Sequence, residues 1–415
     1  MTTPHPHGTA TEDTHMGINT QIQQKAITAM EEMNEDHKER QQVVRSMWVG
    51  LMSRLHVLLI GPGGTGKSYV CRDLVDRIEE ARYFEVALDE TTDPSQVYGP
   101  PDIKAMVEDG KTRRIPTGML PEADIAYFDE YFNANTPMLH SLRPILNERL
   151  FHNNGRPMKT PLKMAVMGTN KISADTDHAP DWDRVHIRED VKYVSDRINK
   201  ADLVMASIER RLRGFTPPSK TTITLDELDM AYDEAMQLTV PDHVQDVFFD
   251  IQDELQGEHG IEVSTRRVVE GMAATLASAW LNGHDEVKVG DLDILASMWW
   301  LTLDQRTDAR QVVLAATNPG EKEALAKLDD LEKQRQEFKN LADLDPVKQN
   351  AAGLQIYKNV KRLVNETKPL LEQAEAAGTS TARIKEVTQG CKKLMETIQK
   401  DIFGLDEDDI SSISS

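Results

Sequence analysis

The stretch GPGGTGKSY at 61–69 combines closely spaced glycines with a lysine and a hydroxyl group. It fits the pattern G-x-x-x-x-G-K-[ST], in which Gly61, Gly66, Lys67 and Ser68 hold the defined positions. Glycines allow successive backbone N–H groups to turn inward and form a concavity that binds anions. The lysine ammonium can reach the outer phosphates of a nucleotide, and the serine hydroxyl can ligate Mg²⁺. The stretch predicts a nucleotide site made of Gly61, Pro62, Gly63, Gly64, Thr65, Gly66, Lys67, Ser68 and Tyr69.

The residues on both sides of this stretch favour a phosphate loop over a chance match to the pattern. Residues 56–60 read as a buried strand and residues 69–78 as a helix. The motif requires this setting, because the helix directs the positive end of its dipole toward the bound phosphate. A glycine-rich turn without a ligand remains the alternative.

Two carboxylates follow the apolar run IAYF at 125–128. We expect this run to be a strand that delivers Asp129 and Glu130 at its carboxyl end, where parallel sheets bind their ligands. Asp129 would hold Mg²⁺ through water, and Glu130 would orient and activate an attacking water. A strand that simply ends in acidic residues is the alternative, and the phosphate-loop pattern upstream argues against it.

A polar side chain ends a second apolar run, MAVMGTN at 164–170. Asn170 can both donate and accept hydrogen bonds, so it suits the positioning of a water against the terminal phosphate. An ordinary turn asparagine is the alternative. The position of Asn170, one strand after Asp129 and Glu130, favours the site.

The elements that must position these residues alternate between strand and helix, which indicates an α/β fold with a parallel sheet covered by helices. The expected strands are 57–60, 83–88, 125–128, 162–168 and 191–194, and the expected helical segments are 20–54, 67–80 and 136–148. A mainly helical part begins near 202 and continues to the breaker cluster ATNPGE at 316–321.

Residues 321–400 differ in composition, with few aromatic residues and apolar residues at three- and four-residue spacing. Two apolar stripes are visible, one with Leu325, Leu328, Leu331, Phe338 and Leu341, the other with Leu354, Val360, Leu363 and Leu370. The stripes predict two or three helices packed as a bundle or an antiparallel coiled coil. A solvated helical spacer is the alternative.

Composition limits the class of protein. The length of 415 residues suggests roughly two to three domains. No apolar run is long enough to cross a bilayer, and the polar N-terminal residues lack the features of a secretory signal. Only two cysteines are present, far apart, which fits a reducing compartment, so we expect a cytoplasmic protein without membrane contact.

The formal net charge of −21 makes nucleic acid an unlikely partner, because an acidic surface repels phosphate backbones. Only short basic clusters are present, TRR at 112–114 and ERRLR at 209–213. We therefore expect a protein partner.

The order of the motifs resembles the MoxR family of AAA+ ATPases, with the RavA-like branch most similar. After GPGGTGKS, IAYFDE and GTN, the segments DWDRVHI at 181–187 and VSTRR at 263–267 complete the resemblance, which covers about residues 40–316. It implies a P-loop AAA+ core with a parallel five-stranded sheet, an all-α lid, ATP and Mg²⁺ as cofactors, and ATP hydrolysis. The domains expected from the pattern and the resemblance are a flexible leader at 1–19, an AAA+ nucleotide-binding domain at 20–199, a helical lid at 200–316, a helical bundle or coiled-coil region at 317–402 and an acidic flexible tail at 403–415.

The resemblance also implies roles for arginines. Arg184 in DWDR matches the arginine finger, which enters the nucleotide site of a neighbouring subunit, and Arg266 in STR matches the sensor-2 arginine of the lid. A delocalised and permanently charged guanidinium can stabilise charge that spreads over a phosphoryl group. A structural salt bridge is the alternative for each, Arg267 is a possible substitute for Arg266, and Arg149 and Arg188 are rival fingers.

The function implied is that of a homo-oligomeric ring, a hexamer in most relatives, which uses ATP to remodel or mature a protein client in the manner of a chaperone. The insertion at 99–120 would contact the client. A separate partner with a von Willebrand A domain is expected, because this chain has no DxSxS adhesion motif of its own. The RavA-like branch carries a β-rich insert, whereas residues 321–415 show no strand alternation. Two alternatives stay open, a motor subunit that acts on nucleic acid or beside a nuclease, and a nucleotide-gated scaffold without turnover.

Overall fold

The computed structural model describes residues 18–170, 182, 184–212, 220–339, 341, 346–377 and 381–402. The predicted leader (apart from residues 18 and 19), two aspartates of the DWDR segment and the predicted acidic tail lie outside these residues. The chain divides into two compact units. Their ranges are Met1–Val244, Val263–Lys288 and Ser297–Leu303 for the first unit, and Gln245–Glu262, Val289–Ala296 and Asp304–Ser415 for the second. No helix among the described residues is long and apolar enough to span a membrane.

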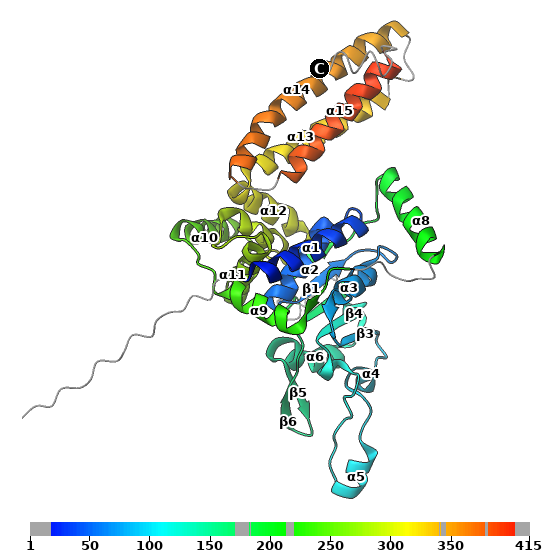
Figure 1. Ribbon diagram of the computed structural model, residues 1–415, viewed down its shortest axis with the longest axis vertical. Coiled ribbons are helices and arrows are strands. Elements are labelled where there is room, and N and C mark those ends of the chain that lie inside the picture. The colour runs from blue at the N-terminus through cyan, green and yellow to red at the C-terminus, as the bar shows by residue number, and fades with distance from the viewer. Residues whose placement is uncertain are drawn as a thin grey trace, which may run out of the picture. The chain divides into compact units, whose positions relative to one another are not determined.

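A parallel five-stranded sheet forms the centre of the first unit, as the sequence predicts (Figure 1). The strands are β1 (Val57–Ile60), β3 (Tyr83–Ala87), β4 (Ile125–Asp129), β7 (Met164–Thr169) and β8 (Ile187–Asp190). Their order is β3-β4-β7-β1-β8, and every neighbouring pair is parallel. All residues of β1 and β7 are buried, which explains their nearly continuous apolar sequences.

The last strand of the sheet lies at 187–190 and not at 191–194, so this prediction was wrong by four residues. The sequence IRED does not look like a buried strand, because it contains charged residues. Two of these, Arg188 and Glu189, are nevertheless buried. The Arg188 guanidinium donates to backbone carbonyls, and the Glu189 carboxylate accepts hydrogen bonds from the hydroxyls of Ser46 at 2.6 Å and Ser297 at 2.5 Å. These bonds offset the cost of burying both charges.

Helices cover the sheet and add a helical layer to the same unit. The longer ones are α1 (Thr20–Asp36), α2 (Gln41–Ser53), α3 (Lys67–Val75), α6 (Thr136–Glu148), α8 (Arg197–Leu212), α9 (Leu225–Met236) and α11 (Thr265–Leu281). The predicted helical segment 20–54 is broken at 37–40, and α3 ends at Val75 because the chain next pairs β2 (Ile78–Glu79) with β9 (Ile223–Thr224). Helices α2, α9 and α11 pack together around fully buried side chains that include Trp48 and Trp280.

Two hairpins project from the sheet, and both lie in the part of the sequence between β3 and β7 (Figure 1). The first follows α4 (Pro94–Tyr98), contains α5 (Ile103–Asp109) and closes through an antiparallel bridge between Pro101 and Arg114. It corresponds to the predicted insertion at 99–120. The second pairs β5 (Leu150–Asn153) with β6 (Arg156–Lys159) and was not predicted from the sequence.

The second unit contains most of α10 (Asp242–Gly257), α12 (Leu303–Thr317) and a bundle of α13 (Pro319–Lys339), α14 (Pro346–Ala377) and α15 (Ala382–Asp401). The 3₁₀ segment Val289–Ser297 lies between α11 and α12. Side chains from all three bundle helices share one buried core, which favours a packed bundle over a solvated spacer. The predicted stripe residues Leu331, Val360 and Leu363 are buried there, whereas Leu354 is exposed.

Candidate nucleotide site

The phosphate loop connects β1 to α3 at the carboxyl end of the sheet. Gly64 and Gly66 have φ angles of 78° and 87°, in the left-handed region that favours glycine. A Cβ atom on Gly63, Gly64 or Gly66 would meet no other atom within 4 Å, so the loop has open space on that side. Lys67 is buried, and its ammonium donates to the carbonyl oxygens of Gly61 at 2.7 Å and Pro62 at 3.2 Å.

Neighbouring segments fix the loop where it leaves β1. The Gly61 N–H donates to the Thr169 carbonyl at 2.9 Å, and a Cβ on Gly61 would lie 2.1 Å from the Val191 carbonyl oxygen. Only glycine therefore fits at this position. The Tyr193 hydroxyl donates to the Gly63 carbonyl at 3.0 Å. The loop is held between β7 and the segment that follows β8.

The predicted metal ligand Asp129 is the last residue of β4, and Glu130 follows it in the left-handed conformation, with φ 52°. Asp129 Oδ1 accepts hydrogen bonds from the Tyr127 hydroxyl and from the Glu130 N–H, each at 3.1 Å. These two donors fix the Asp129 carboxylate. The Glu130 carboxylate accepts a longer hydrogen bond of 3.3 Å from the Asn133 side chain.

Strand β7 brings the three motifs together. A Cβ on Gly168 would lie 2.8 Å from Asp129 Oδ1, so the Asp129 carboxylate lies against the end of β7. The next residue, Thr169, accepts the hydrogen bond from Gly61, and Asn170 follows it with an exposed side chain. Asn170 thus stands between the phosphate loop and the acidic pair at one edge of the sheet.

The residues at this edge fit a magnesium nucleotide. The loop offers backbone N–H groups, a lysine ammonium and the half-buried Ser68 at the start of α3. Open space lies over the glycines, and a fixed carboxylate and an exposed amide stand beside them. Oxygen ligands and a helix amino terminus are the groups that Mg²⁺ and phosphate prefer.

Arg184 lies elsewhere in the unit. It is half-buried in a turn three residues before β8, and Trp182 in the same segment stacks on Phe132 with ring centroids 4.6 Å apart. Ile187 pairs with Val57, so the turn leads into the amino end of the sheet. The length of β1, about 10 Å, separates this end from the phosphate loop.

The two rival arginines are structural. Burial lowers the pKa of Arg149 to about 10, and its guanidinium donates to the carbonyls of Leu162 at 2.9 Å and Arg54 at 2.7 Å. Arg188 donates to the Trp182 carbonyl at 2.5 Å and also to that of Trp300. Both guanidinium groups bond to backbone carbonyls inside the unit.

The structure separates Arg266 from Arg267, the residue that the sequence offered as a substitute. Arg267 is 2% exposed and donates to the carbonyls of Met298 at 2.7 Å and Trp300 at 2.6 Å. Arg266 is exposed at the start of α11. Burial first, and then the charges of nearby arginines that include Arg188 and Arg266, lower the pKa of His186 to about 3. Arg266 therefore lies near the segment that carries Arg184, at the entry of β8.

Matched alanine variants of these neighbours should separate a working arginine from a structural one. We expect Arg267→Ala to lower the free energy of unfolding by about 3 kcal/mol, because two buried carbonyls lose a charged donor. Arg266→Ala should change it by less than about 0.5 kcal/mol and should reduce ATP turnover. Thermal unfolding and phosphate release measure the two effects. A stable Arg267→Ala protein without turnover would reverse the assignment.

Glu39 lies in the turn between α1 and α2 and bonds this turn to the segment that follows β8. Its carboxylate accepts hydrogen bonds from the Ser195 N–H at 2.8 Å, the Asp196 N–H at 2.9 Å and the Asn199 side chain at 3.0 Å. Partial burial alone would raise the pKa of Glu39, but the hydrogen bonds outweigh it and lower the pKa to about 2. The adjacent Arg40 donates to the Thr65 carbonyl in the phosphate loop at 3.4 Å.

Stability should depend on pH through Glu39. Its usual pKa of 4.5 falls to about 2 in the folded chain, so its contribution is complete above pH 4.5 and is lost between pH 4.5 and 2. We expect Glu39→Gln to lower Tm most at neutral pH, with a difference from the wild type that shrinks as the pH falls. Glu35→Gln, at an exposed position of α1, is the control. A Tm difference that is constant with pH would contradict the assignment.

Sequence reasoning missed several residues that shape the site. Tyr127 lies within the predicted strand and holds Asp129. Arg40 and Tyr193 bond to the phosphate loop, and Glu39 bonds to the segment that follows β8. An alternating position on a strand could have indicated Tyr127. No local pattern indicates the other three, because their partners lie more than 100 residues away for Glu39 and Tyr193 and 25 residues away for Arg40.

Two family models match the chain. The model described as the MoxR domain in the MoxR-vWA-beta-propeller ternary systems matches residues 24–230. The model described as an AAA lid domain matches residues 243–313. The first match includes the phosphate loop, the acidic pair, Asn170 and Arg184.

Related proteins come from an archaeon and from a virus. An uncharacterized protein of Methanocaldococcus jannaschii, MJ0079, is 28% identical over 320 residues, which are 77% of this chain and 82% of that protein. A second, MJ0812, is 29% identical over 275 residues, 66% of this chain and 71% of that protein. The structural protein ORF618 of Acidianus two-tailed virus is 27% identical over 225 residues, 51% of this chain and 36% of the viral protein.

A solved structure shares the fold. A candidate ATPase from Cytophaga hutchinsonii matches with a TM-score of 0.57 and 14% identity, over 72% of this chain and 94% of that protein. The strand order, the two family matches and this likeness agree with the α/β AAA+ fold that the motifs predicted. The chain belongs to the MoxR family of AAA+ ATPases.

Proposed function

We propose that this chain hydrolyses ATP with Mg²⁺ in a homo-oligomeric ring and uses the cycle to remodel or mature a partner protein. The observation that carries the proposal is the convergence at β7. The phosphate loop bonds to Thr169, Asp129 lies against Gly168, and Asn170 follows directly. Binding alone would need only the loop, whereas hydrolysis needs the acidic pair and the amide as well.

Each group at this edge has a distinct role in the proposal. Loop N–H groups and Lys67 bind the phosphates, and Ser68 and Asp129 would hold Mg²⁺, which supplies positive charge against the triphosphate. Glu130 accepts a proton from the attacking water, and Asn170 orients that water. The hydrogen bond from Tyr127 keeps the Asp129 carboxylate in place.

The position of the arginines supports the proposed ring. Arg184 and Arg266 lie at the entry of β8, whereas the phosphate loop lies beyond the other end of β1. Guanidinium groups at that end are suited to a nucleotide of a neighbouring subunit. In this proposal both arginines act in trans, and an isolated chain hydrolyses ATP slowly.

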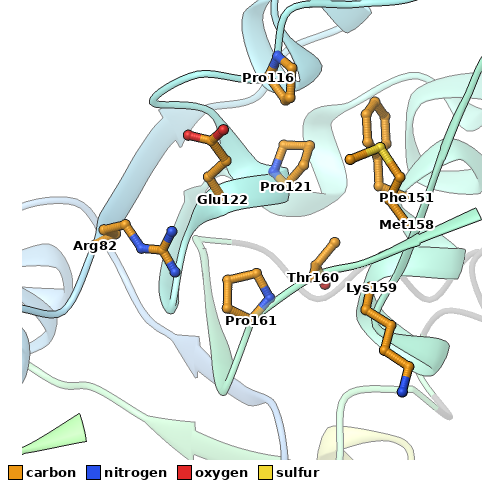
Figure 2. Close-up of a pocket in the computed structure, with 9 residues that line it drawn as sticks. All are labelled: Arg82, Pro116, Pro121, Glu122, Phe151, Met158, Lys159, Thr160 and Pro161. Carbon is orange, nitrogen blue, oxygen red and sulfur yellow. The ribbon is translucent and has the colours of Figure 1, made fainter.

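The two hairpins are the proposed contact with the client. The Arg114 N–H donates to Asn153 Oδ1 at 2.8 Å, and the Asn153 amide donates back to the Arg114 carbonyl at 3.0 Å. A cavity of about 420 Å³ lies between the segment 116–122 and the β5–β6 hairpin, with apolar side chains that include Pro121 and Phe151 and charged ones from Arg82, Glu122 and Lys159 (Figure 2). The exposed side chains of Ile103, Met106 and Val107 on α5 add apolar surface.

The first proposed partner is a protein with a von Willebrand A domain. A β-propeller protein is proposed as a second partner. This extension rests on the matching family model, whose name refers to systems of these three components. Localisation in the cytoplasm is proposed on the basis of the two distant, buried cysteines.

Turnover measurements on the assembled protein test the proposal. We expect phosphate release that requires Mg²⁺, is absent in Lys67→Ala and does not increase when DNA is added at low salt. Stimulation by DNA would favour a nucleic-acid motor instead. The basic cluster at 112–114 offers little for that role, since Arg113 pairs with Asp102 at 2.8 Å and Arg114 bonds to the Gly99 carbonyl. Nucleotide binding without turnover in the assembled state would favour a scaffold.

A further inference from the structure

Helix α8 exposes a large part of its apolar surface. Among its described side chains none is buried, and its large apolar residues are each at least 36% exposed: Ile198, Leu203, Val204, Met205, Ile208 and Leu212. Figure 1 shows the helix (green) standing apart from the sheet of its own unit. A contiguous apolar surface of this kind marks an interaction site in a folded protein.

The apolar residues follow the spacing of a helix-pairing seam. Ile198, Ala201, Met205, Ile208 and Leu212 are separated by steps of three, four, three and four residues. This alternation places all five on one stripe, which is the a/d pattern of packed helices. Leu203 lies on the opposite side of the helix.

The helix needs a partner for its stability. An isolated helix of 16 residues is marginal in water, and propensity alone rarely maintains one in a protein. Its amino end is well fixed, because Asp196 caps it through the N–H groups of Ile198 at 2.7 Å and Asn199 at 3.1 Å. Glu39 holds the same end. The capped helix is thus presented with its stripe uncovered.

Charge identifies the kind of partner. Residues 197–212 contain four basic and two acidic residues, whereas the whole chain has a net charge of −21. A basic helix with an apolar stripe complements an acidic surface that has an apolar centre. Other copies of this chain provide acidic surfaces.

Helix α10 presents such a surface. Residues 242–257 contain five acidic residues and no lysine or arginine. Phe249 is 50% exposed, and the exposed residues Asp246 and Asp253 lie three positions before it and four positions after it on the same face. An aromatic ring flanked by carboxylates matches an apolar stripe flanked by cationic side chains.

We propose that α8 of one chain packs its stripe against the Phe249 face of α10 in a second copy of this chain, with Arg197, Lys200 and Arg211 near Asp246 and Asp253. The inference rests on the oligomer of the proposed function and names a surface that builds it. The segment before α8 contacts the phosphate loop through Tyr193, so this docking joins assembly to the nucleotide site.

Two glutamate substitutions on the same helix test the stripe. Met205→Glu places a charge on the stripe, and Leu203→Glu places the same charge on the opposite side as a matched control. Sedimentation of the full chain with ATP should show self-association weakened roughly tenfold or more in Met205→Glu, because a buried methionine is lost. Leu203→Glu should assemble as the wild type does. Equal assembly of both variants would overturn the inference.

Charge exchange tests the acceptor. Asp253→Lys and Arg211→Glu should each weaken assembly, and the double variant should recover part of it, since residue 211 of one copy meets residue 253 of the next. Additive losses in the double variant would overturn the pairing. A matched double variant of Glu35→Lys with Arg211→Glu should show no recovery.

The remaining outcomes separate this inference from the proposed function. A Met205→Glu chain that assembles and hydrolyses ATP as the wild type does overturns the inference alone, and a wild-type chain that assembles through α8 without turnover overturns only the ATPase. If Met205→Glu no longer sediments with phosphatidylserine vesicles but assembles as the wild type does, the stripe binds a lipid surface, and the inference is overturned. If Met205→Glu lowers the Tm of a monomeric chain, the stripe packs within its own chain, and the inference is again overturned.

Discussion

Glu130→Gln should bind ATP as tightly as the wild type and should lower turnover by about 100-fold or more, since a positioned general base contributes at least that factor. The substitution removes the proton acceptor but keeps the shape of the side chain. Glutamine can still bond to Asn133, which lies 3.3 Å from Glu130 Oε2. Glutamine and glutamate adopt the left-handed backbone conformation of residue 130 equally well, so the variant should keep the fold.

Binding and turnover must be measured on the same sample. Titration with a fluorescent ATP analogue gives the affinity, and phosphate release gives the rate. Asp129→Asn is the informative companion, because Asp129 is fixed by Tyr127 and by the Glu130 N–H and is assigned to the metal. Asp129→Asn should raise the Mg²⁺ concentration needed for half-maximal turnover, whereas Glu130→Gln should not. Full turnover in Glu130→Gln would remove the water-activating role.

The parts of the site that could be predicted from the sequence are those set by local chemistry. Strand β1 has the predicted bounds, and the phosphate loop follows it as its pattern requires. Asp129, Glu130 and Asn170 were expected together because parallel strands end at one edge, and the position of β7 between β1 and β4 brings them there. Periodicity also indicated the bundle core around Leu331 and Leu363.

Some of the features that were missed depend on contacts between residues that are distant in the sequence. Strand β8 was placed four residues too late, because Arg188 and Glu189 bond to Trp300 and Ser46, which lie more than 100 residues away in the sequence. The β5–β6 hairpin did have a local signal, the dipeptide Asn154–Gly155. Both residues have positive φ, at 53° and 71°, as a type I′ turn demands.

The choice among basic residues shows the same limit. Arg149, Arg184 and Arg188 are equivalent in sequence, but in the structure Arg188 is buried, whereas Arg149 and Arg184 are half-buried, and both Arg149 and Arg188 bond to backbone carbonyls. In the same way Arg267 is committed to Met298 and Trp300, and Arg266 is not. The sequence indicates that a guanidinium is needed, but the carbonyl partners of Arg149, Arg188 and Arg267 become visible only in the folded chain.

Arg184→Ala should lower turnover by roughly 1,000-fold, the size of an arginine-finger effect, while the chain still binds ATP. The position of Arg184 at the entry of β8, away from its own phosphate loop, predicts that the loss can be rescued by a neighbour. Lys67→Ala chains cannot hold the phosphates but keep Arg184. In a mixture, an intact loop of one chain can meet the intact finger of the other, so part of the activity should return.

The mixing experiment needs a control which shows that co-assembly of two variants does not by itself restore activity. Arg184→Ala mixed with a chain that carries both Arg184→Ala and Lys67→Ala assembles in the same way but contains no finger, and it should stay inactive. Turnover measured against the mixing ratio should pass through a maximum, because only mixed interfaces hold both groups. A finger that served its own chain would give no activity at any ratio, and Arg184 would then be reduced to a structural residue. Arg266→Ala in place of Arg184→Ala should show the same maximum if its proximity to the finger segment reflects a shared task in the neighbouring site.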